Sequence, residues 1–254
     1  MITFGITNSS KYDTNSHKYM EVLLESIWQE NIPDVEIIAC GDYKNSRIKC
    51  IEFEGTISKK LNTLVDNSTK ENIILIRDYM ELKQGFLDGF KKFGFDWDLS
   101  MCVVLNKDNR RYRDWAVWRG DDLFPNDSWI QREKWTNGGK VVPGRVYIPS
   151  YDYTDTDRMY ISGGLFMGKT KFFKENKFNN DLDIGDAEDV EWFDRCVRDK
   201  GINYKMNQYS IIKLQKQKDT IIPYTDKKYG TFEYCTEKFL EFHGTELAES
   251  LGNW

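Results

Sequence analysis

The sequence is poor in the residues that mark disordered, membrane-spanning or secreted chains. Only 5 of its 254 residues are proline, while 40% are hydrophobic and 15% aromatic, so a packed core is expected and low-complexity disorder is excluded. No apolar run approaches the roughly 18 residues that a membrane-spanning helix needs, and we expect no such helix. The first ten residues lack a basic start and a long apolar run, which predicts no signal peptide and a cytoplasmic protein.

Paired cysteines and an excess of basic charge are also absent. The 5 cysteines are odd in number and widely spaced, with no CxxC pair, so neither a disulfide framework nor a zinc site is expected. The formal net charge is −5, which argues against a general nucleic-acid binder and is compatible with a site for a divalent cation. At 254 residues the chain predicts one sizeable domain, alone or with a small appendage.

Strand and helix patterns alternate through the first eighty residues. The β-rich segments are 2–6, 35–42, 47–53 and 72–79, and the helical ones are 18–30 and 58–68. This order predicts a mostly parallel sheet with helices on its faces. Ligands of such sheets bind beyond the carboxyl ends of the strands, where the sequence places Thr7, Asn8, Asp42 and Asp78.

Predicted strands and helices alternate less regularly in the later part of the chain. Strands are expected at 99–107, 145–153, 159–168 and 210–217, and helices at 82–94, 186–201 and 236–254. The segment 110–135 has four tryptophans and no clean period; it is either a loop-rich excursion packed on the sheet or the wall of an open site on which carbohydrate stacks. The lysines of 213–218 and 226–228 form either a solvated face or a loop that closes over a diphosphate.

The stretch GDAEDVEW (185–192) concentrates four carboxylates at the start of a predicted helix. One explanation is structural, because Asp186 suits an N-cap, Asp189 completes a reciprocal cap and acidic residues complement the helix dipole. The other is chemical. A carboxylate at a helix start, beside the glycine pair Gly163–Gly164, can accept a proton from an incoming hydroxyl, which makes Asp189 a candidate general base.

The segment IILIRDY (73–79) offers a second candidate site. A carboxylate that closes a buried strand can hold Mg²⁺ or Mn²⁺ on a diphosphate, or it can simply start a turn. Asp78 occupies this place.

The order of these motifs resembles the nucleotide-sugar glycosyltransferases of the GT-A fold, especially inverting family 2, over residues 1–215. The resemblance implies a Rossmann-like α/β fold with a mostly parallel central sheet flanked by helices and an aromatic-rich acceptor-side region. Its nucleotide-binding half would be about 1–105, its acceptor half about 106–215, and 216–254 a C-terminal loop and helix. By resemblance, Asp189 is the catalytic base; the acceptor side includes Glu188, Gly163, Gly164 and Trp192; the nucleotide is held by Thr7, Asp42, Lys60, Asn62 and Asp78.

One motif departs from the family pattern. The family's DxD motif is reduced to Asp78, followed by Tyr79 and Met80. The resemblance implies Mn²⁺ or Mg²⁺ on Asp78, with His243 as a second ligand, although His243 is equally compatible with a solvated helix position. Alternatively, Arg77 replaces part of the cation's charge and weakens metal dependence.

The function expected from these motifs is inverting transfer of a sugar from a nucleoside-diphosphate donor to a hydroxyl of a carbohydrate, lipid-linked or protein acceptor, in surface polysaccharide or other glycan synthesis. Two rivals remain. A nucleotidyltransferase would need a glycine-rich basic loop after the first strand, and GITNSSKY (5–12) has only one glycine and one lysine. A non-catalytic nucleotide-sugar-binding module is favoured by the reduced DxD motif.

Overall fold

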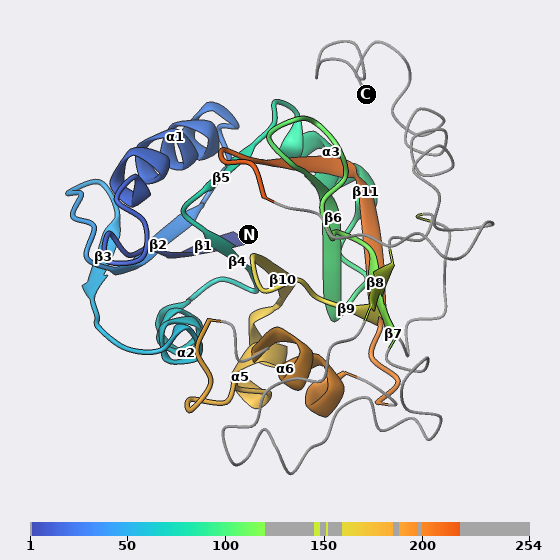
Figure 1. The fold of residues 1–254 in the computed structure, drawn as a ribbon. Helices are drawn as coiled ribbons and strands as arrows, with labels where there is room; N and C mark the ends of the chain where they lie inside the picture. Colours follow the sequence, from blue (N-terminus) through green and yellow to red (C-terminus); the bar gives the residue numbers. More distant parts are fainter. Residues whose placement is uncertain are drawn as a thin grey trace.

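The computed structural model describes residues 2–119, 145–147, 151, 159–184, 188–197 and 200–218. These residues form an eight-stranded sheet in the order β3-β2-β1-β4-β10-β6-β11-β5, with helices on both faces, and a small sheet in the order β8-β7-β9 (Figure 1). The strands of the large sheet are β1 (Ile2–Thr7), β2 (Glu36–Gly41), β3 (Lys49–Glu52), β4 (Asn72–Arg77), β5 (Met80–Leu82), β6 (Leu99–Leu105), β10 (Leu165–Lys169) and β11 (Tyr204–Leu214).

The helices cover the sheet in two layers. They are α1 (Ser16–Gln29), α2 (Ile57–Asn67), α3 (Phe86–Phe93), α5 (Thr170–Glu175) and α6 (Glu188–Cys196). In Figure 1, α1 and α3 lie on one side of the sheet, whereas α2, α5 and α6 lie on the other. The predicted helical spacing in α1 is confirmed, because Met20, Leu23, Leu24 and Ile27 are all buried.

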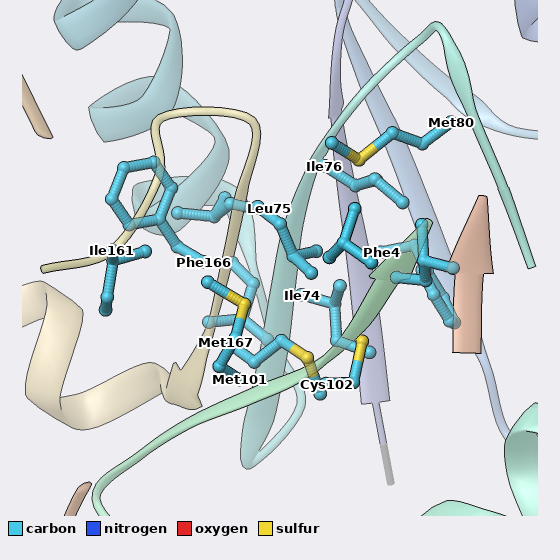
Figure 2. Packing of buried hydrophobic residues seen from close by; sticks show 14 of the residues in the cluster. Phe4, Ile74, Leu75, Ile76, Met80, Met101, Cys102, Ile161, Phe166 and Met167 are labelled. Carbon is cyan, nitrogen blue, oxygen red and sulfur yellow. The ribbon is translucent and has the colours of Figure 1, made fainter. Parts of the chain in front are cut away.

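Each face of the sheet has its own core. Phe4 and Ile74 are partners in the register of β1 and β4, and Phe4 packs against Phe86 of α3 with ring centroids 6.5 Å apart. Leu75 and Phe166 are partners in β4 and β10 and point to the other face (Figure 2). The central strand β4 is therefore apolar on both faces, as expected for a strand covered by helices on both sides.

The predicted mostly parallel α/β sheet is confirmed, with two additions that the sequence did not reveal. Strands β1, β2, β3 and β4 pair in parallel, as do β6 and β11. However, β10 runs antiparallel between β4 and β6, and the short strand β5 pairs antiparallel with β11 at the edge. Strand β10 overlaps the strand expected at 159–168, but its direction depends on partners distant in the sequence.

The position of β5 requires the sheet to curl. Only Asp78 and Tyr79 separate β4 from β5, a link that spans roughly 11 Å when extended. In a flat sheet the four strand spacings between β4 and β5 would measure about 19 Å. A bulge in β11 between Asn207 and Ile211 contributes to the curl, because bulges bend the strand that carries them. The curl brings the end of β11 back to the residues that follow β4.

The small sheet belongs to the expected aromatic-rich region. It consists of β7 (Ala116–Arg119), β8 (Arg145–Tyr147) and β9 (Met159–Tyr160), all antiparallel. The expected C-terminal helix, Asp186 and most of the segment 110–135 lie outside the described residues. Cys40, Cys50, Cys102 and Cys196 are free thiols, and within the described part of the chain no helix is long and apolar enough to cross a membrane.

Candidate active site

A pocket of about 610 Å³ opens at the carboxyl edge of the sheet. Its walls come from the loop after β1, the start of α2, the end of β4, the turn before β10, the start of α6 and the segment after β11. Seven of the residues predicted from the sequence line it: Thr7, Lys60, Asp78, Gly163, Gly164, Glu188 and Asp189. The structure thus gathers motifs from both halves of the chain into one concave site.

The glycine pair connects the end of β4 to the start of α6. Arg77 donates from Nε to the carbonyl of Gly163 at 3.1 Å and from its backbone N–H to the carbonyl of Gly164 at 3.1 Å. The Gly163 N–H donates to Asp189 Oδ2 at 2.7 Å. A Cβ atom on Gly163 would lie 2.9 Å from Glu188 Oε1 and 3.1 Å from Asp189 Oδ2. Glycine is therefore required at 163 for the carboxylates to approach the turn this closely.

Glu188 and Asp189 form an adjacent pair of carboxyl groups with different surroundings. Glu188 is only 6% exposed, and its Oε1 lies 3.5 Å from the Arg77 guanidinium, whereas Asp189 is half-buried. Burial, together with the neighbouring charge of Asp189, raises the pKa of Glu188 to about 8. A neutral Glu188 at pH 7 does not repel the negative charge of Asp189. A carboxyl pair of which one member is neutral and the other ionised can supply one acid and one base.

Helix α6 is fixed in place by Trp192, which the sequence assigned to the acceptor side. The indole is 0% exposed and stacks on Phe173 and Phe178 at centroid distances of 5.2 and 5.0 Å. Its Nε1 donates to the Asn176 carbonyl at 2.7 Å. A side chain with no exposed surface does not contact an acceptor in this structure, so Trp192 positions the helix that carries Asp189.

Asp42 lies at the rim of the site rather than in the pocket wall. Its Oδ1 accepts from Asn8 Nδ2 at 2.7 Å, and its Oδ2 accepts from the Ser10 N–H at 3.0 Å. Burial acts to raise the pKa of Asp42, but the hydrogen bonds from Ser10 and His17 and that of its own backbone together outweigh it, and the pKa lies below the usual value. Gly41 permits this arrangement, because a Cβ there would lie 2.2 Å from the Asn8 carbonyl oxygen.

The end of β1 and the loop that follows it present polar atoms that have no hydrogen-bond partner among the described residues. Thr7 and Asn8 are 2% and 3% exposed and line the pocket, and Thr7 Oγ1 and Asn8 Oδ1 accept or donate no hydrogen bond among the described residues. Buried polar atoms are normally paired, so an orphaned pair at a pocket wall indicates a place for a ligand. Asn8 was recognised from the sequence only as part of the loop.

Lys60 and Asn62, both predicted to hold the nucleotide, separate in the structure. Lys60 Nζ reaches the pocket and donates to the Asn8 carbonyl at 2.9 Å, and burial lowers its pKa. Asn62 does not line the pocket; it donates to the Phe178 carbonyl at 2.9 Å and accepts from the Phe178 N–H at 3.0 Å. Asn62 therefore fastens α2 to the loop after α5.

Among the described residues, Asp78 does not sit in a set of metal ligands. Its carboxylate accepts a hydrogen bond from Ser16 Oγ at the start of α1, and burial raises its pKa, against the lowering effects of that bond and of Arg77 and Lys216. Among the described residues no group of three or more His, Cys, Asp or Glu could hold a metal ion. His243 lies outside those residues. Within the described part of the chain, a single buried carboxylate beside cationic side chains does not fit a divalent cation, which favours several oxygen ligands.

Two lysines of the 213–218 segment, which the sequence left open between a solvated face and a loop that closes over a diphosphate, complete the wall. Lys216 and Lys218 line the pocket, so the solvated face considered for 213–218 is wrong for them. Lys216 Nζ donates to Asp13 Oδ2 at 2.6 Å, and Lys218 Nζ donates to the Tyr79 hydroxyl at 2.6 Å. The available signal was the alternation with Gln215 and Gln217 at the end of the strand predicted at 210–217, which places the two lysines on one side of the chain.

Comparison with known proteins shows the fold. No family model and no curated protein sequence matches the chain. The structure of GalNAc-T7 with UDP, GalNAc and Mn²⁺ superposes with a TM-score of 0.56 at 11% identity, covering 99% of this chain and 58% of that one. The S. aureus TarS 1–349 structure in complex with UDP gives 0.50 at 12% identity, covering 90% and 59%. The chain has the GT-A fold and spans less than two thirds of either structure.

Proposed function

We propose that the protein is a glycosyltransferase that moves a sugar from a nucleoside-diphosphate donor to an acceptor hydroxyl. The observation that carries the proposal is the Gly163–Gly164 turn, which hydrogen-bonds Arg77 on one side and Asp189 on the other within a single pocket. This arrangement supports a donor site at the end of β4 directly beside a carboxylate base. UDP, which is bound in both structures of similar fold, is the first nucleotide to test.

The proposed reaction is a direct displacement with inversion. Asp189 accepts the proton of the acceptor hydroxyl, whose oxygen forms a bond to the anomeric carbon. The bond from that carbon to the diphosphate oxygen breaks, and the nucleoside diphosphate leaves with the electron pair. The hydrogen bond from the Gly163 N–H to Asp189 Oδ2, 2.7 Å long, orients the carboxylate. Glu188, neutral at pH 7 because burial raises its pKa to about 8, can donate a hydrogen bond to the acceptor.

The nucleotide would lie against the loop after β1. The unpartnered Thr7 Oγ1 and Asn8 Oδ1 supply hydrogen-bonding atoms, Lys60 supplies positive charge, and Asp42 closes the rim. The predicted Mn²⁺ or Mg²⁺ on Asp78 finds no further described ligand, so no step of the proposed reaction passes through a metal ion.

A thermal-shift panel of UDP, GDP, TDP and CMP, each with and without Mn²⁺, tests the donor half of the proposal. A ligand at about 100 times its dissociation constant adds roughly 2.7 kcal/mol of stability. We expect one nucleoside diphosphate to raise the melting temperature and CMP to have no effect. The absence of a shift with all four nucleotides would remove the proposal.

The rival binding module predicts the same nucleotide binding but no chemistry. Sugar release from the corresponding nucleotide sugar, followed with carbohydrate, lipid-linked and protein acceptors, separates the two. We propose surface polysaccharide or other glycan synthesis as the setting, so activity with a carbohydrate or lipid-linked acceptor is expected. A protein that binds the nucleotide and transfers nothing to any acceptor class would be the module.

A further inference from the structure

The segment Gln215–Lys218 is built into the fold at the pocket mouth. The Gln215 N–H donates to the Tyr79 carbonyl at 2.8 Å, and Gln215 Nε2 donates to the Met80 carbonyl at 2.8 Å. At the other end, Asn106 Nδ2 donates to the Lys218 carbonyl at 2.6 Å and Asn106 Oδ1 accepts from the Lys218 N–H at 2.9 Å. These bonds fix the backbone, so the two lysine side chains start from defined positions.

Tyr79 is the platform on which the lysines rest. The ammonium groups of Lys216 and Lys218 lie 4.6 and 4.1 Å from the centre of its ring, within the range of cation–π contacts. The Tyr79 hydroxyl oxygen would lie 3.4 Å from a Cβ atom on Gly164. The lysines therefore lie next to the glycine turn and to Asp78, where the donor diphosphate is proposed to bind.

The cations of this wall are weakly compensated by protein carboxylates. Among the described residues, the Lys218 ammonium contacts the neutral Tyr79 hydroxyl and the rings of Tyr79 and Tyr112, and no carboxylate pairs with it. Arg77 lies 3.5 Å from Glu188, a group that burial keeps neutral at pH 7. Lys216 has one carboxylate partner, Asp13. Burial and the nearby charges of Arg77 and Lys216 lower the pKa of Lys218. Grouped like charges of this kind are stabilised by a bound anion.

We propose that Lys218, Lys216 and Arg77 bind and neutralise a diphosphate group in this pocket, in the role that a divalent cation beside Asp78 was expected to fill. The inference rests on the proposed function for the identity of the diphosphate as part of a nucleotide-sugar donor. The Arg77 guanidinium presents several donors to phosphate oxygens, and the two ammonium groups act as point charges. Asp78, held by Ser16, then serves as a counterion within the cationic wall.

The test is calorimetric titration of the full chain with inorganic pyrophosphate and with UDP, GDP and TDP in turn, each in excess EDTA and in Mn²⁺. We expect pyrophosphate and one nucleoside diphosphate to bind in EDTA. Loss of one charge-assisted hydrogen bond weakens binding about 10- to 100-fold, and we expect this effect from Lys218→Gln. Lys216→Gln should weaken binding less, because Asp13 already pairs with the Lys216 charge. Lys218→Arg keeps the positive charge and should retain most of the affinity.

Lys171→Gln is the matched control. It removes the same charge from an exposed position on α5, where its ion pair is with Glu175 at 3.8 Å, and should leave both titrations unchanged. Thermal melting of each variant establishes that it is folded.

The outcomes separate the two proposals. Binding of the nucleoside diphosphate that requires Mn²⁺ and is unaffected by Lys218→Gln overturns the basic site and retains the proposed function. Metal-free binding of pyrophosphate that is lost in Lys218→Gln, with no nucleoside diphosphate binding, supports the anion site and removes the donor assignment. If neither ligand binds under any condition, both proposals fail.

Discussion

Two walls of the pocket carry opposite charges and are assembled in different ways. The acidic wall consists of Glu188 and Asp189, consecutive residues at the first turn of α6, with the glycine turn 163–164 against them. The basic wall consists of Arg77, Lys216 and Lys218, which come from the end of β4 and from the segment after β11. A motif that is compact in sequence marks the proposed chemistry, whereas proposed binding of the leaving group depends on residues that only the curled sheet brings together.

The largest effect is expected from the acidic wall. Asp189→Asn should reduce the rate of sugar transfer about 10²- to 10⁴-fold, because a general base contributes on that order, and should leave nucleoside-diphosphate affinity unchanged. Steady-state kinetics and calorimetry measure the two quantities. Asp181→Asn, an exposed neighbour in sequence, is the control. If Asp189→Asn lowered donor affinity by the same factor as the transfer rate, the two walls would not act separately.

The acidic wall also depends on its support. Trp192→Ala should lower the free energy of unfolding by about 3–5 kcal/mol, the usual cost of truncating a large buried aromatic, because it removes the stack with Phe173 and Phe178. Urea unfolding gives the value. Trp28→Ala, at a partly buried position in contact with Arg47, should cost less. A similar cost for both would contradict the anchoring role assigned to Trp192.

The two glycines of the turn should differ. Gly163→Ala places a methyl group 2.9 Å from Glu188 Oε1 and 3.1 Å from Asp189 Oδ2, and we expect overpacking to cost about 1–3 kcal/mol with a clear loss of transfer rate. Gly164→Ala instead meets the mobile end of the Met80 side chain at 2.6 Å and should be milder in both respects. The prediction is wrong if the rate falls more in Gly164→Ala.

Glu188 makes stability depend on pH in a direction opposite to that of a salt-bridged carboxylate. Its pKa is about 8 in the folded protein against 4.5 for the free group, so the folded state binds the extra proton between these values. The contribution of Glu188 to the free energy of unfolding is fully present below pH 4.5 and is lost as pH rises through 8. Relative to wild type, Glu188→Gln should gain stability progressively over this window. Melting temperatures at pH 5 and pH 9 test it, and a constant difference would contradict the buried neutral acid.

The smallest effect is expected at Asp78. If Asp78 is a counterion in the basic wall, Asp78→Asn leaves one more positive charge uncompensated, and metal-free pyrophosphate binding should be unchanged or tighter. Ser16→Ala, which removes the hydrogen bond to Asp78, is the matched variant that keeps the charge. Mn²⁺-dependent pyrophosphate binding that is lost in Asp78→Asn but kept in Ser16→Ala would return Asp78 to the role of a metal ligand.

Much of the sheet could be predicted because its elements are locally consistent. Strands β1, β2 and β4 are short apolar runs separated by amphipathic helices, and their predicted parallel pairing is confirmed. The antiparallel course of β10 and the position of β5 could not be predicted, since strand direction and order depend on partners far away in sequence. Trp192 illustrates the same limit for side chains: helical spacing places it on α6, but only packing against α5 decides that it is buried.

The sequence by itself determined the α/β class, the polar loops at the strand ends and the closeness of Glu188 to Asp189, because each of these depends on residues within a few positions of one another. Tertiary structure alone decided that the Gly163 N–H meets Asp189, that Arg77 lies beside Glu188, and that Lys216 and Lys218 face the pocket. The physical reason is the curl of the sheet: it is required by the two-residue link between β4 and β5, and it places the end of β11 against Tyr79.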